Sequence, residues 1–79
     1  MKILEIRDNP GETCDRYTVV YDAMGDRQGY HYALALSANP FHPLGFGQHG
    51  TAQPGDHLGK KISFAALPAD CQKLVKQDL

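Results

Sequence analysis

The first half of the chain contains three segments in which hydrophobic and polar residues alternate, at residues 2–7, 16–22 and 30–36. Alternation with a period of two is typical of a strand that is buried on one side. β-branched and aromatic residues, which suit a pleated sheet, are frequent in the second and third segments. The connections between the segments are short and contain glycine, so we predict antiparallel neighbours in a β-meander.

The alternation also assigns each side chain to a face. Leu4 and Ile6 are expected to share one face of the first strand. The third segment has one face of large apolar side chains, Tyr30, Tyr32, Leu34 and Leu36. Its other face carries mostly small side chains, His31, Ala33, Ala35 and Ser37. The large face should pack on another element, whereas the small face leaves room for a backbone, a ligand or a partner to approach closely.

The spacing of apolar residues changes near the C-terminus from two to that of a helix. The apolar stripe consists of Leu67, Cys71, Leu74 and Val75. Pro68 suits the first turn of a helix, and Asp70 follows it where the helix dipole favours negative charge. A helix of about ten residues is marginal alone in water. We therefore predict that it lies across the large face of the sheet, over Tyr32 and Leu34.

Residues 37–60 show neither period. They hold five of the eight glycines, three of the five prolines and three of the four histidines, but almost no charge before Asp56. We predict a long ordered Pro/Gly/His loop that packs on the domain through its aromatic and aliphatic side chains. The cis or trans state of the Asn39–Pro40 and His42–Pro43 peptide bonds stays open. A short extended piece is expected at residues 62–64.

The fold class predicted from these elements is α+β. It comprises a three- to four-stranded antiparallel β-meander, one C-terminal helix and the long ordered loop. The whole chain, residues 1–79, is expected to form a single small domain.

Composition excludes several classes of protein. The chain is 42% hydrophobic with a net charge of −1, which argues against disorder and against a nucleic-acid partner. Glu5 interrupts the N-terminal apolar residues, and no apolar run approaches the ~20 residues that span a bilayer, so a cytoplasmic protein without a membrane segment is expected. In that compartment Cys14 and Cys71 are predicted to be reduced thiols, with a disulfide as the alternative.

Residues 45–50, GFGQHG, match the pattern G-x-G-x-x-G of dinucleotide-binding loops. That fingerprint requires a helix directly after it, because the helix N-terminus holds the phosphates. Pro54, Gly55 and Gly59 leave no room for such a helix. We therefore predict no dinucleotide site and no cofactor, and keep an anion-binding turn as the alternative.

Three histidines of the loop, His42, His49 and His57, could hold zinc together with Asp56. Their spacing matches no compact zinc motif, so we predict no metal site and keep a metal- or ligand-binding domain as the alternative function. Acid–base catalysis by His49 with Asp56 is the third hypothesis. No serine or cysteine has the setting of a nucleophile, so we predict no catalytic residues and a protein that is not an enzyme.

Segments throughout the chain resemble a group of small uncharacterised proteins of bacteria, their phages and mobile elements. The most distinctive is the motif NPFHPxGFGQH at residues 39–49, followed by LGKKISF at 58–64 and LPxDCQKL at 67–74. The resemblance covers roughly the whole chain. It implies a bacterial or phage context and no known activity.

The leading hypothesis is a non-enzymatic binding module that contacts a protein partner through the loop. Its expected binding residues are Asn39, Phe41, His42, Phe46, Gln48 and His49. A constrained, nearly uncharged loop with aromatic side chains offers anchors at low entropic cost. In a phage or mobile-element context, an inhibitor of a host defence protein would fit. The sequence leaves open whether the chain forms a homodimer.

Overall fold

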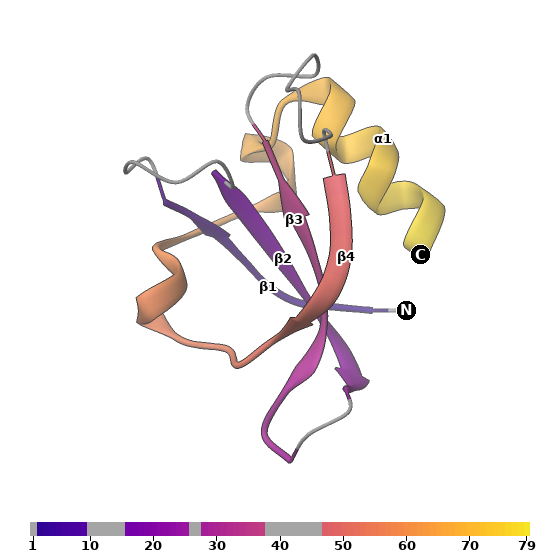
Figure 1. Cartoon of the computed structure of the whole chain (residues 1–79). Coiled ribbons are helices and arrows are strands. Elements are labelled where there is room, and N and C mark those ends of the chain that lie inside the picture. Colours follow the sequence, from indigo (N-terminus) through magenta and orange to yellow (C-terminus); the bar gives the residue numbers. More distant parts are fainter. Residues whose placement is uncertain (1, 10–15, 26–27, 38–46) are drawn as a thin grey trace.

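The computed structural model describes residues 2–9, 16–25, 28–37 and 47–79. Five strands form one antiparallel sheet in the order β4-β3-β2-β1-β5, and the helix α1 covers one of its faces (Figure 1). The strands are β1 (Ile3–Asp8), β2 (Tyr17–Met24), β3 (His31–Leu36), β4 (Gly47–Ala52) and β5 (Lys60–Ile62). The helical elements are the single turns η1 (Asp56–Leu58) and η2 (Phe64–Ala66) and the helix α1 (Ala69–Asp78).

The predicted α+β class, the meander β1–β2–β3 and the C-terminal helix are confirmed. No helix in the described ranges is long and apolar enough to cross a membrane.

The number of strands and the extent of the irregular loop were predicted wrongly. The sheet has five strands, because β4 forms within the expected loop and β5 begins at Lys60, ahead of the extended piece expected at 62–64. The sequence of β4, GQHGTA, has no hydrophobic alternation because the strand lies at the sheet edge and is exposed along nearly its whole length. Residues 38–46 lie outside the described residues, and with them Asn39, Pro40, Phe41, His42, Pro43 and Phe46.

Leu4 does not share a face with Ile6. Ile3 pairs with Tyr21, but the register then shifts, so that Ile6 pairs with Val19. A β-bulge inserts one extra residue into a strand and reverses the alternation beyond it. Ile3 and Ile6 consequently contribute to the core, whereas Leu4 is 43% exposed.

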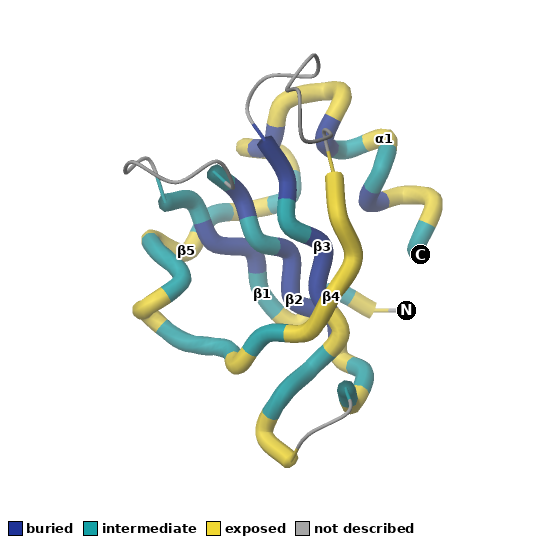
Figure 2. Tube along the Cα trace, in the orientation of Figure 1, coloured by how far each residue is buried: buried dark blue, intermediate teal, exposed yellow. Residues whose placement is uncertain are grey.

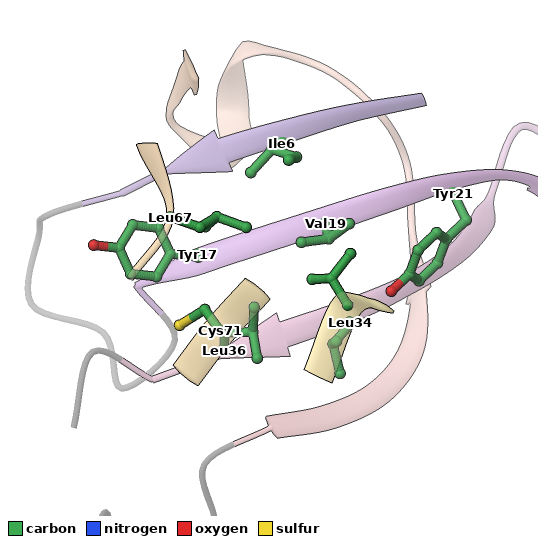
Figure 3. Packing of buried hydrophobic residues seen from close by; sticks show 9 residues of the cluster. Ile6, Tyr17, Val19, Tyr21, Leu34, Leu36, Leu67 and Cys71 are labelled. Atoms are coloured by element: carbon green, nitrogen blue, oxygen red, sulfur yellow. The ribbon is translucent and has the colours of Figure 1, made fainter. Parts of the chain in front are cut away.

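The core lies between α1 and the sheet. Leu34 and Leu36 of β3 are buried with Cys71 and Val75 of α1, which confirms the predicted apolar stripe of the helix (Figure 3). Tyr32, however, is 45% exposed. A ten-residue helix is only about 15 Å long. The helix α1 covers Leu34 and Leu36 but does not reach Tyr32, so the prediction that it covers Tyr32 was wrong.

Cys71 is buried in this core, and burial raises the pKa of its thiol. Its sulfur lies 3.9 Å from the carbonyl oxygen of Ser37, to which the thiol donates a weak hydrogen bond. Cys71 is a free cysteine, and its raised thiol pKa disfavours the thiolate, which is the reactive form. Cys14 lies outside the described residues.

The face of the sheet away from α1, here called the outer face, is built from the intervening residues of each strand. Two rows of paired residues cross it: Gln48, Ala35, Thr18 and Arg7 form the first, and Gly50, Ala33, Val20 and Glu5 form the second. The small side chains predicted for one face of β3 therefore lie at the centre of the outer face, next to the edge strand β4.

Candidate binding site

An open hollow of about 330 Å³ lies on the outer face, between β4 and the η1 turn. Residues of β2, β3, β4 and η1 line it: Thr18, Ala33, Ala35, Gln48, His49, Gly50, Thr51, Ala52 and Leu58. None of them bears a carboxylate, ammonium or guanidinium group. The floor consists of Ala33, Ala35 and Gly50, which carry at most a methyl group above the backbone. We call this concavity the outer-face hollow.

One wall of the hollow is Leu58, in the connection between β4 and β5. These two strands lie at opposite edges of the sheet, so the connection runs from one edge to the other (Figure 1). Arg7 on β1 holds it in place. Its Nη1 donates hydrogen bonds to Asp56 Oδ1 at 2.9 Å and to the carbonyl oxygen of Gly59 at 3.2 Å.

Glu5 completes this arrangement, which we call the Arg7 clasp. Its Oε2 accepts a hydrogen bond from Arg7 Nη2 at 2.8 Å, and its Oε1 accepts one from the Gly55 backbone N–H at 3.0 Å. The side chains of Glu5 and Arg7 are only 10% and 11% exposed. The hydrogen bond from Arg7 is the main influence that lowers the pKa of Glu5, so both groups stay charged. The clasp has a structural role: it fixes the wall of the outer-face hollow.

His49 makes its contact on the other side of the sheet. It pairs with Leu34, whose side chain lies under α1, so its imidazole points toward the helix. Its Nε2 lies 2.8 Å from Asp78 Oδ2, and the Tyr21 hydroxyl donates to the same oxygen at 2.6 Å. Burial opposes ionisation of Asp78, but the hydrogen bonds from Tyr21 and His49 outweigh it and hold the pKa of Asp78 below its ordinary value. These contacts join the edge strand β4 to the end of α1.

A pH dependence of stability follows from Tyr21. Burial, followed by the hydrogen bond to Asp78, raises the pKa of Tyr21 above its ordinary value of 10. The folded state therefore retains this proton where the unfolded chain has lost it, so the contribution is complete below pH 10 and is lost as the pH rises above it. We expect urea unfolding of wild type to show a steeper loss of stability than that of Tyr21→Phe as the pH rises above about 10, the ordinary pKa of tyrosine. Identical slopes for the two proteins would contradict this assignment.

The structure gives His49 and Asp56, the pair of the third hypothesis, different partners. Asp56 contacts Arg7 near the outer face, whereas His49 contacts Asp78 on the side of α1. The His49 side chain is 64% exposed, and its imidazole contacts Asp78 although His49 also borders the outer-face hollow. Within the described ranges, no three His, Cys, Asp or Glu residues are grouped so that they could hold a metal ion.

Of the six residues predicted to bind a partner, the described part of the chain contains Gln48 and His49. Both belong to β4 and both are among the residues that line the hollow, but their side chains lie on opposite faces: Gln48 pairs with Ala35 on the outer face, whereas the His49 imidazole contacts Asp78 on the side of α1. Thr18 and Leu58, which also line the hollow, were missed. Their positions depend on strand register and on the Arg7 clasp, which no local sequence pattern indicates.

The GFGQHG pattern does not form a phosphate-binding loop in its described part. Residues 47–50 are extended within β4, which continues to Ala52 and is followed by η1. The two glycines of β4 have unlike surroundings. A Cβ atom on Gly47 would lie 2.9 Å from Leu74 Cδ1, so glycine allows β4 to pack closely against α1. A Cβ atom on Gly50 would meet no atom within 4 Å.

Comparison of the chain with known protein families, with curated proteins and with solved structures finds no match.

Proposed function

We propose that this protein is a non-enzymatic binding module that takes up an extended segment of another protein as a sixth strand beside β4. The observation that supports this proposal best is the contrast between the two edges of the sheet. Edge strands expose unpaired backbone groups, and proteins commonly block them with short strands, lysine, proline or bulges. The edge at β5 has such protection, whereas the described part of the chain gives the edge at β4 none.

The strand β5 has three residues, of which Lys60 and Lys61 are exposed. The strand β4 has six residues, with no lysine, no proline and no register shift against β3. It is exposed along nearly its whole length (Figure 2). In an antiparallel strand, alternate residues direct their N–H and C=O groups toward opposite sides. The residues of β4 that do not bond to β3 therefore present donors and acceptors outward, which is the surface that peptide-binding domains use for strand addition.

The edge is also held in its binding conformation before a partner arrives. Gly47 packs against Leu74 of α1, and His49 contacts Asp78 at the end of the same helix. A partner strand would therefore not have to order β4 on binding, which reduces the entropic cost of association. The resemblance to bacterial, phage and mobile-element proteins makes a host protein of that setting the first class of partner to test.

Strand addition is testable with selected peptides and a pair of proline variants. Random linear peptides displayed on phage would be selected on the 79-residue protein, and their binding measured by fluorescence polarisation. Gln48 and Thr51 differ by an odd number of positions, so one of their N–H groups faces β3 and the other faces outward. Of Gln48→Pro and Thr51→Pro, the variant that loses the outward N–H should keep the fold and lose at least about tenfold in peptide affinity, the equivalent of one hydrogen bond.

The other proline variant should lose stability, because it removes a hydrogen bond within the sheet. Backbone amide shifts induced by the bound peptide should map to residues 47–52. Shifts confined to α1 or β5 would refute strand addition at β4. A peptide-free dimer that pairs through β4 would replace the foreign partner with a second copy of the chain, and analytical ultracentrifugation would reveal it.

A further inference from the structure

Gly50 lies where the fold itself does not need a glycine. Glycine weakens a strand because it has the most conformational freedom to lose and no side chain to pack. At Gly47 the close approach of Leu74 explains why the residue is glycine. At Gly50 no such neighbour exists, because a Cβ atom there would have no atom within 4 Å. That space is the outer-face hollow. Glycine within a strand also marks places where a ligand or another chain approaches closely.

The chemistry of the hollow defines what fits there. Its floor, formed by Ala33, Ala35 and Gly50, is a platform of small groups on the sheet surface. Thr18 and Gln48 add a hydroxyl and an amide, and no fixed positive or negative charge lies among the lining residues. A volume of about 330 Å³ is at the small end of ligand pockets. An uncharged, flat and mainly apolar group with one polar atom matches these properties.

The hollow is continuous with the edge that we propose as the docking site, since Gln48, Gly50 and Ala52 of the edge strand β4 are among its lining residues. Aromatic side chains with a polar atom, those of tryptophan and tyrosine, are the most frequent anchors in protein interfaces. We propose that the outer-face hollow is a specificity pocket for a tryptophan or tyrosine side chain of the added strand. This inference rests on the proposed function, because the ring belongs to the segment that pairs with β4.

The test uses indole and p-cresol, the free side-chain analogues, as probes of the 79-residue protein. Titrations followed by ¹H–¹⁵N spectra should shift the amides of Ala33, Ala35 and Gly50 saturably, with dissociation constants on the order of 1 mM for fragments of this size. Cyclohexanol, an aliphatic alcohol of similar size, should bind at least about tenfold more weakly because it cannot lie flat on the platform. Equal binding of cyclohexanol, or no saturable shift with either ring, would overturn the pocket.

Gly50→Leu should fill the hollow and abolish the shifts. Because the Cβ position is unobstructed, the variant should keep the wild-type fold, and its spectrum shows whether it does. Gln53→Leu is the matched control: it places a leucine just beyond β4, outside the lining residues, and should leave probe binding unchanged. If Gly50→Leu does not fold, Gly50→Ala provides a smaller obstruction. It should weaken probe binding at least about threefold, which corresponds to slightly less free energy than the ~0.8 kcal/mol of burying one CH₂ group.

The two proposals fail separately. Selected peptides that pair with β4, combined with no probe binding in the hollow, would overturn the specificity pocket and leave strand addition standing. Probe binding in the hollow that Gly50→Leu abolishes, combined with peptides that shift no amide of β4, would overturn strand addition and with it the assignment of the ring to an added strand. Peptides that lose affinity with Gly50→Leu and contain an essential tryptophan or tyrosine would support both.

Discussion

Gly59→Ala is expected to destabilise the protein by at least about 2 kcal/mol, about half of the ~3–5 kcal/mol typical of a core this size. Gly59 has φ of 115°, a conformation that side chains with a Cβ rarely adopt. A Cβ there would lie 2.5 Å from the carbonyl oxygen of Asp8 and 2.9 Å from the backbone nitrogen of Asn9. Both are backbone atoms: Asp8 is the last residue of β1, and Asn9 follows it. Neither atom can move aside without breaking the pairing of β1 with β5.

Urea unfolding followed by circular dichroism would measure this loss. Gly50→Ala is the matched control, since the same substitution meets open space there. Its stability should be unchanged or up to about 1 kcal/mol higher, because alanine loses less conformational freedom than glycine in a strand. Equal losses for the two variants would show that Gly59 is not held against Asp8.

Leu34→Ala is expected to cost about 2–5 kcal/mol and to leave much of the protein unfolded at room temperature. Leu34 is 1% exposed and lies at the centre of the core between the sheet and α1. Truncation removes its transfer free energy and leaves a cavity that the surrounding strands can only partly close.

Comparing Tyr32→Ala with Leu34→Ala tests how far α1 extends along β3. Tyr32 is two residues from Leu34, and the sequence pattern places both under α1. Because α1 does not cover it, its truncation should cost less than about 1 kcal/mol. Thermal unfolding of both variants would measure the difference. A loss at Tyr32 as large as that at Leu34 would mean that the helix lies further along the sheet than the structure shows.

The sequence predicts well those elements in which one face is buried. The meander and the helix follow from alternation and from the spacing of Leu67, Cys71 and Val75, because burial on one side imposes a period on the residues. The bulge at Leu4 shows the limit of this reasoning. A single extra residue reverses the faces of a strand, and the residues KILEIR are compatible with either arrangement.

The edge strand β4 could not be predicted from periodicity. Neither side of it is covered enough to demand hydrophobic residues, so GQHGTA is held by backbone pairing with β3 and by contacts with α1. Such pairing is non-local, and the residues themselves do not encode it. The hollow was anticipated only in part: the small side chains of Ala33 and Ala35 indicated the face, whereas its wall at Leu58 depends on the Arg7 clasp.

Amide hydrogen exchange across residues 47–52 of the free protein tests most directly whether β4 is an open edge strand. The account predicts alternation: the amides that bond to β3 exchange slowly, and the intervening ones exchange at rates close to those of a free peptide. Addition of a selected peptide should then slow the intervening amides. Uniformly fast exchange across the segment would show that it is not a strand, and uniformly slow exchange without a partner would show that its outer edge is already covered.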